Sequence, residues 1–299
     1  SFLAAKYESV QLDGVIGNSD QACVFIEEKC GFAEDLPKAY YTSNLEYEAD
    51  NVLCLDSQYA VGIRKTWALM QSVFPEMTEV FLIEGDPATS ATVAAELASL
   101  VPDTIALTAY KNFTFAELED RLKALPPTAA VIYTFVTRDS EGTQTIPRVH
   151  LSRLAEISPA PIFTLWETLV GSGTVGGHVL SAIRTSRELL RGIEEYLQTG
   201  SFSEDYSITR CMIDWTAMDR HGLETDKIPE DAFVINKPDP FYITHAKLIL
   251  VVVNIVLIAF FLILLTGILI IIHSYRKLRT VNAELSIERE KAQALVLSG

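Results

Sequence analysis

The sequence lacks the residue patterns that mark the common catalytic and metal sites. No HExxH, GxSxG or GxxxxGK(S/T) pattern occurs in its 299 residues. The histidines are scattered, at His150, His178, His221, His245 and His273. A lone histidine such as His178 is more often structural than catalytic. We therefore expect no catalytic residue, no cofactor and no metal ion in this chain.

Cysteine is scarce, and its spacing excludes the usual metal-binding patterns. The four cysteines, Cys23, Cys30, Cys54 and Cys211, form no CxxC or Cys/His ligand set. Cys23 and Cys30 lie seven residues apart on a predicted helix, about 10 Å by helical rise, too far for a disulfide. The sequence favours buried free thiols and leaves a disulfide between Cys54 and Cys211 open.

Basic residues are outnumbered, because 24 Lys and Arg stand against 39 Asp and Glu. The net charge of the whole chain is −15. Residues 273–299 carry five basic and three acidic side chains, a net charge of +2, so residues 1–272 carry a net charge of −17. Nucleic acid requires a basic surface, so we exclude it as a partner. A leader with a basic and an apolar part is also lacking, and the first residue is Ser1. We expect a piece of a longer precursor, also cut at Gly299.

One long hydrophobic run, Leu248–Ile272, contains no charged residue over 25 positions. At about 1.5 Å per residue it is long enough to cross about 30 Å of hydrocarbon. The alternative is a fully buried helix of a soluble protein. Arg276, Lys277 and Arg279 follow the run, whereas Lys247 stands alone before it. The positive-inside rule then predicts a single pass, with residues 1–247 outside and the C-terminus in the cytoplasm.

Before this run, short apolar strands alternate with helices of 10–16 residues, which predicts an α/β fold with parallel sheets covered on both faces. The predicted strands are 12–20, 39–43, 79–84, 104–108, 129–135, 161–165 and, as the last one, 208–215. The predicted helices are 2–9, 21–29, 59–74, 89–100, 114–124, 147–157 and 186–198. Residues 229–240 are rich in proline and acid, so we expect an extended segment packed on the domain.

Polar residues follow several predicted strands, where open parallel sheets bind ligands. Arg138 would pair with an anionic ligand group and Trp166 would stack on a flat one. Several of these residues also fit a structural role, such as a helix cap at Ser19 or Asp20. The candidate ligand-binding residues are Ser19, Asp20, Asn44, Asp86, Arg138, Asp139, Trp166 and Glu167.

The run Gly171–Gly176 matches GxGxxG, but the residues after it, from Gly177 to Ser181, favour an extended chain. A dinucleotide site requires a helix that begins at those glycines. We therefore predict a loop and a strand here, with a hinge as one further interpretation, and no nucleotide.

The order of several segments resembles a known family. These are AAVIYTFVTRDSEG from Ala129, ISPAPIF from Ile157 and LWETLVGSG from Leu165, with DGVI from Asp13 and Asp214-Trp215 in the same pattern. They are similar to the ABC-transporter substrate-binding-protein-like sensor domains, of the type I periplasmic-binding-protein fold, in bacterial histidine kinases and diguanylate cyclases. The resemblance implies two α/β lobes that close on a small molecule. Members begin with a further strand and helix before the equivalent of Phe2, so we expect truncation there.

Residues after the hydrophobic run predict a signalling helix. Heptad a and d positions hold Leu278, Val281, Leu285, Glu288, Ala292 and Leu295. Two such helices side by side would form a parallel homodimer, whereas a solvated amphipathic tail is the alternative.

The sequence thus predicts five parts: the remainder of a first lobe (1–56), a second lobe (57–200), a return segment and linker (201–246), a transmembrane helix (247–273) and a cytoplasmic helix (274–299). We expect the sensor and membrane portion of a bacterial inner-membrane receptor, a histidine kinase with a diguanylate cyclase as the alternative. Its partners would be a small-molecule ligand or a periplasmic binding partner, and membrane lipid. The alternatives are a membrane-tethered enzyme and an ectodomain that docks another protein.

Overall fold

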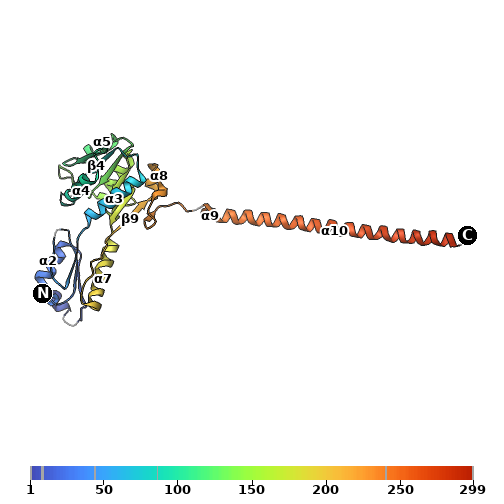
Figure 1. Ribbon diagram of the computed structural model, residues 1–299, viewed down its shortest axis with the longest axis horizontal. Helices are drawn as coiled ribbons and strands as arrows, with labels where there is room; N and C mark the ends of the chain where they lie inside the picture. The colour runs from blue at the N-terminus through green and yellow to red at the C-terminus, as the bar shows by residue number, and fades with distance from the viewer. Residues whose placement is uncertain (1, 8–9, 44, 86, 240, 298–299) are drawn as a thin grey trace. The chain divides into compact units, whose positions relative to one another are not determined.

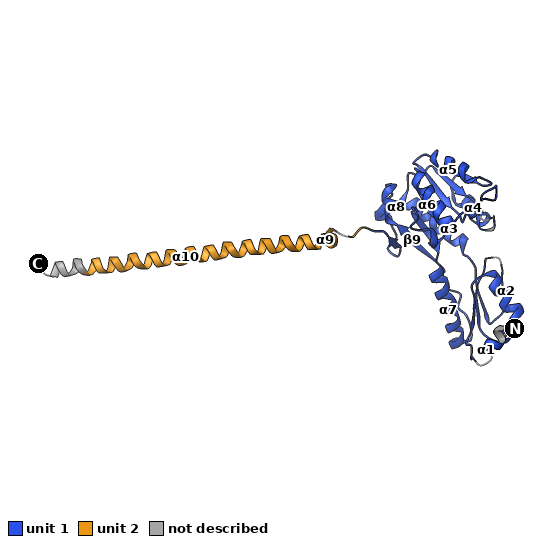
Figure 2. Ribbon diagram, turned by 180° about the vertical axis from the view of Figure 1, so that it is seen from behind, with its two compact units in different colours: residues 1–237 blue, residues 238–299 orange. Residues whose placement is uncertain are grey.

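The computed structural model describes residues 2–7, 10–43, 45–85, 87–239 and 241–297. The chain divides into two compact units, Ser1–Lys237 and Pro238–Gly299, which Figure 2 colours separately. The first unit holds two sheets, and the second unit is helical.

The first unit begins with a small parallel sheet in the order β1-β2-β3, formed by Val15–Gly17, Lys38–Tyr41 and Val52–Leu55. Helix α2 (Asp20–Lys29) packs beside β1, and helix α7 (Ala182–Thr199) lies along the sheet in both ribbon views (Figure 1, Figure 2). The flanking elements are α1 (Phe2–Tyr7) and the 3-10 helix η1 (Gly31–Ala33). The sequence did not reveal β3, a four-residue strand that follows an acidic loop.

The large sheet has seven strands in the order β10-β9-β8-β7-β6-β4-β5. Its pairs are parallel except β8 with β9. The strands are β4 (Glu79–Ile83), β5 (Ala106–Tyr110), β6 (Ala129–Tyr133), β7 (Ile162–Thr164), β8 (Gly176–Leu180), β9 (Thr209–Asp214) and β10 (Phe233–Ile235). The helices are α3 (Tyr59–Val73), α4 (Pro87–Leu100), α5 (Phe115–Lys123), α6 (Pro147–Ile157) and α8 (Trp215–Arg220), with 3-10 helices η2 (Glu167–Leu169) and η3 (Thr225–Lys227). The predicted α/β class with parallel sheets is confirmed.

The central strand β6 shows why both sheet faces are covered. All five of its residues are buried. Ala130 and Ile132 pack into the cluster that includes α3 and α4. Val131 and Tyr133 pack into the cluster that includes α5 and α6. Because strand side chains alternate between faces, a continuous apolar strand requires helices on both sides.

One predicted detail differs in the structure. The strand at residues 208–215 is not the last, because β10 pairs with β9 within the proline-rich segment. Helix α7 packs on the small sheet, where Leu189 and Ile193 join the cluster of Ala39 and Leu53. The division of the lobes at residues 56 and 200 stays a prediction. The glycine run leads into strand β8, as its extended pattern indicates.

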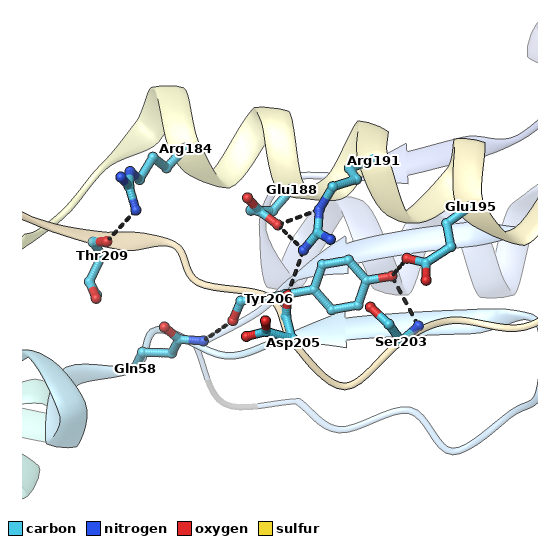
Figure 3. A network of polar contacts seen from close by, with 9 residues as sticks. All are labelled: Gln58, Arg184, Glu188, Arg191, Glu195, Ser203, Asp205, Tyr206 and Thr209. Atoms are coloured by element: carbon cyan, nitrogen blue, oxygen red, sulfur yellow. Dashed lines mark hydrogen bonds and ion pairs between the residues drawn. The ribbon is translucent and has the colours of Figure 1, made fainter.

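Three chain segments pass between the two sheets, and hydrogen bonds join them. The segment after β3 meets the return segment where Gln58 Nε2 donates to the Tyr206 carbonyl at 3.1 Å. The start of α7 meets it where Ser181 N donates to the Ile208 carbonyl at 3.0 Å. Arg184 Nη1 donates to the Thr209 carbonyl at 3.2 Å (Figure 3). We call these three hydrogen-bonded passages, at residues 56–58, 181–184 and 206–209, the bonded crossing.

The return segment is held against α7 by polar contacts. The Tyr206 hydroxyl donates to Glu195 Oε2 at 2.7 Å, and Ser203 N donates to that hydroxyl at 3.3 Å (Figure 3). Arg191 pairs with Glu188 and lies 4.5 Å over the Tyr206 ring. Because one side of α7 carries this network while its Leu189 side packs on the small sheet, the helix is fixed to the small lobe.

The second unit contains α9 (Phe241–Thr244) and a continuous 52-residue helix, α10 (Ala246–Leu297). Within α10, the stretch Ala246–Glu290 has a window of mean hydropathy 3.4 with none of that window buried in the chain. By length and composition this helix can cross a membrane. The predicted membrane span and the predicted signalling helix are therefore parts of one helix.

We predict that Gly176→Ala destabilises the protein strongly. Gly176 has φ +111°, and a Cβ there would clash with the Met212 carbonyl of the paired strand. The left-handed backbone costs about 1–2 kcal/mol, and displacement of the strand adds about 1–3 kcal/mol. Gly142→Ala is the control, because its φ is +86° and no atom lies within 4 Å. Urea unfolding of the full chain in detergent, followed by tryptophan fluorescence, measures both. Equal losses for the two variants would contradict the steric argument.

Candidate ligand-binding cavity

A cavity of about 760 Å³ lies among residues of both lobes, beyond the carboxyl ends of β1, β2 and β3 and at the starts of α2, α3 and α4. This is the position at which open parallel sheets place ligands. Its lining is mostly polar, and is formed by Asn18, Ser19, Asp20, Gln21, Tyr41, Thr42, Ser43, Leu45, Glu46, Asp56, Ser57, Tyr59, Ala60, Thr89 and Thr92.

The wall from the small lobe is built by the start of α2 and the end of β2. Ser19 is the N-cap of α2, and its hydroxyl accepts a hydrogen bond from Ala22 N at 3.2 Å. Asp20 follows in the first turn, and its Oδ1 accepts from Ser43 N at 2.8 Å. Buried Thr42 donates its hydroxyl to the Leu45 carbonyl at 2.6 Å. These bonds hold the two polar segments together at the cavity.

The wall toward the large lobe is built by the crossing after β3 and by the starts of α3 and α4. Ser57 is 8% exposed and lines the cavity, and its hydroxyl makes no hydrogen bond to another described residue. Tyr59, at the start of α3, interacts with the Tyr41 side chain, and both residues line the cavity. Burial, with the neighbouring Tyr59 as the next cause, raises the pKa of Tyr41 above its ordinary value. Tyr41 is therefore neutral at physiological pH.

The charge of the lining is one-sided. Asp20, Glu46 and Asp56 contribute carboxylates, and no Lys, Arg or His is among the described lining residues. Asp56 Oδ1 accepts from Gln58 N at 3.3 Å, which orients it at the crossing. Within the described part of the chain, neither Glu46 nor Asp56 forms an ion pair.

Two of the eight candidate residues from the sequence, Ser19 and Asp20, line the cavity. Asn44 and Asp86 lie outside the described residues. Arg138 and Asp139 lie in a turn on the large lobe, away from the lining. Asp139 Oδ1 accepts from Glu141 N and Thr143 N, so its carboxylate holds the turn.

Trp166 and Glu167 do not line the cavity, but both support its surroundings. The Trp166 ring lies 5.4 Å from the Tyr59 ring and 5.8 Å from the Phe135 ring. Trp166 thus backs a lining residue. Glu167 forms an ion pair with Arg210, with side-chain exposures of 15% and 20%. Arg210 also lies 4.5 Å over the Phe233 ring, so the pair joins η2, β9 and β10.

The sequence reading missed several lining residues. Tyr41 lies in a predicted strand and Thr89 begins a predicted helix. Their places at an end of these elements indicate the edge of the sheet at which the cavity lies. Asp56 and Ser57 follow β3, the strand that the sequence did not reveal. Because β3 was not predicted, the sequence did not indicate that Asp56 and Ser57 line the cavity.

The described residues contain no group of three or more His, Cys, Asp and Glu that could hold a metal ion. The four cysteines are free thiols, so the bridge between Cys54 and Cys211 that the sequence left open is not formed. Burial raises the pKa of Cys23 and of Cys211 to about 11, which makes both thiols weak nucleophiles.

We predict that Glu167 is structural. Glu167→Gln leaves the Arg210 charge half-buried without its partner, and we expect a loss of about 2 kcal/mol, between the values for surface and buried pairs. The control is Asp120→Asn in the exposed pair with Lys123, which should cost less than about 0.5 kcal/mol. Urea unfolding measures both variants. If Glu167→Gln and Asp120→Asn lose the same free energy of unfolding, the Glu167–Arg210 pair stabilises the fold no more than an exposed pair does.

We predict that the protein loses stability in mild acid partly through His178. Burial, followed by the charge of Lys65, lowers the pKa of His178 from 6.5 to about 4. The unfolded chain therefore binds a proton first, and the stabilisation present above pH 6.5 falls as the pH decreases towards 4. His178→Gln should flatten this part of the curve, while His273→Gln, at an exposed position, should not. Burial also lowers the pKa values of His150 and His221, so these two residues should maintain part of the pH dependence in the variant. An unchanged pH profile in His178→Gln would refute the assignment.

Comparisons with known proteins identify the fold. No protein-family model matches the chain, and no curated protein matches it by sequence. The ligand-free, open structure of a substrate-binding protein with adhesive properties from Clostridium difficile matches with TM-score 0.58 and 13% identity, over 79% of this chain and 82% of that one. The ABC domain in complex with L-Trp from Streptococcus pneumonia matches with TM-score 0.47 and 12% identity, over 78% and 84%. The first match shows that the chain has a type I periplasmic substrate-binding-protein fold.

Proposed function

We propose that the chain is the ligand-sensing and membrane-spanning portion of a bacterial signal-transduction receptor. The observation that carries this proposal is the polar cavity whose walls come from both lobes. A small molecule that contacts Ser19 on one wall and Tyr59 on the other would favour a closed arrangement over an open one, because it gains contacts only when both walls are near.

The bonded crossing supports a closing motion. Three short passages connect the lobes, and two of them are hydrogen-bonded to the third, the return segment between Tyr206 and Thr209. Rotation about such a crossing changes a few backbone angles and leaves the two packed lobes intact. The same return segment leads into β9, which pairs with β10, the last strand before Pro238.

Helix α10 supports the membrane part of the proposal. Its apolar stretch is followed by Arg276, Lys277 and Arg279. By the positive-inside rule these residues support a C-terminal part in the cytoplasm, with residues 1–247 outside the bacterial inner membrane. The heptad positions after the span favour a parallel homodimer. In the full-length protein the output module would be a histidine kinase, or alternatively a diguanylate cyclase.

The experiment is a thermal-shift screen of the full chain in lipid nanodiscs against a metabolite panel. A ligand at about 100 times its Kd stabilises the folded state by about 2.7 kcal/mol, which raises Tm by about 5–10 °C for a domain of this size. Ala60→Trp should abolish the shift by filling the cavity. Ala68→Trp is the matched control, because it lies on the same helix at an exposed position outside the cavity.

Two outcomes would contradict the proposal. In the first, no compound stabilises the parent chain. In the second, a compound stabilises Ala60→Trp and Ala68→Trp equally, so that binding occurs elsewhere. Fractionation of cells that express the chain tests the membrane part separately, since a spanning helix stays in the membrane pellet after alkaline extraction.

A further inference from the structure

The carboxylates that line the cavity, together with the Ser57 hydroxyl, indicate the chemical class of its ligand. We propose that the cavity selects a small organic cation that bears an ammonium group, held by Asp20, Glu46 and Asp56. This inference rests on the proposed function and names the chemical class of its ligand.

The charged side chains of the described cavity lining are all acidic. The described lining includes three carboxylates and no Lys, Arg or His. An anionic ligand would meet like charge in a half-enclosed site, whereas a cation would gain from every carboxylate.

Helix starts at the cavity act in the opposite direction, because a helix N-terminus favours an anion. At α2 that preference is already used, because the Ser19 hydroxyl accepts the Ala22 N–H and Asp20 lies in the first turn, where its charge complements the helix dipole. Helix α3 begins at the cavity without a side-chain cap hydrogen bond. Its partial positive charge, about half a unit, is smaller than the full negative charges of Glu46 and Asp56.

Ser57 provides an independent sign of a ligand. Its side chain is more than nine-tenths buried and lines the cavity, and its hydroxyl has no hydrogen-bond partner among the described residues. The Ser57 oxygen is not among the described side-chain atoms that are fully buried and lack a partner, so it is accessible from the cavity. A hydroxyl next to Asp56 can accept the N–H of an ammonium group whose charge the carboxylate balances.

The aromatic lining favours an organic cation over a metal ion. Tyr41 and Tyr59 line the cavity, and Trp166 lies behind Tyr59. Aromatic faces attract ammonium groups and also pack against their carbon substituents. The described residues hold no cluster that could bind a metal ion. A cavity of about 760 Å³ also exceeds what a single ion requires.

The test compares probes of similar shape and different charge on the full chain in nanodiscs. The cations are phenethylamine, choline and putrescine; 2-phenylethanol is the neutral probe and 3-phenylpropionate the anionic probe. We expect at least one cation to raise Tm, with at least tenfold weaker binding of the neutral probe and no binding of the anion. Higher salt should weaken cation binding, because screening reduces the attraction.

Charge-removing variants locate the effect. Asp56→Asn and Glu46→Gln should each weaken cation binding about tenfold while the fold is kept. Glu48→Gln is the matched control, because Glu48 is exposed two residues from Glu46 and does not line the cavity. Circular dichroism and Tm without ligand confirm that each variant is folded.

The outcomes separate the two proposals. Tighter binding of the neutral or anionic probe, or of an uncharged or anionic metabolite at the Ala60 site, overturns cation selection and leaves the sensor proposal standing. Equal effects of Asp56→Asn and Glu48→Gln also overturn it. If no probe and no metabolite binds the parent chain, both proposals fail.

Discussion

The parallel pairing of the strands is the constraint on which the rest of the structure depends. Each parallel strand must be followed by a crossover, so strand ends and helix starts gather at the same edge of the sheet. In the small lobe this edge carries Ser19, Ser43 and Asp56. In the large lobe it carries Thr89 at the start of α4. The polar groups of the cavity are therefore a consequence of the topology.

The large and small lobes meet this constraint in different ways. The large lobe has helices on both faces, and alternate residues of β6 pack into separate clusters. In the small lobe, helix α7 comes from a later part of the chain and packs on the sheet, where Leu189 and Ile193 complete the core. Because α7 comes between β8 and β9, the chain must cross between the lobes again, and these passages form the bonded crossing.

Much of the fold could be predicted from the sequence, but only part of the site. Long, strongly patterned helices such as α3 and α6 were predicted within a residue or two, because burial of one face imposes the helical period. Ser19 was predicted as a cap and as a candidate contact, since short polar residues at strand ends favour both roles. Strand β3 follows β2 with no helix between them, so the alternation of strands and helices does not indicate it, and Asp56 and Ser57 are not among the predicted contacts.

The sequence by itself determined the α/β class, the apolar helix near the C-terminus and the absence of catalytic motifs, because these follow from local periodicity and composition. Only the tertiary structure decided which polar residues meet. It brought Tyr41 to Tyr59 and paired Glu167 with Arg210, 43 residues away. Such contacts depend on strand order and on the packing of α7, which side-chain patterns along the chain do not encode.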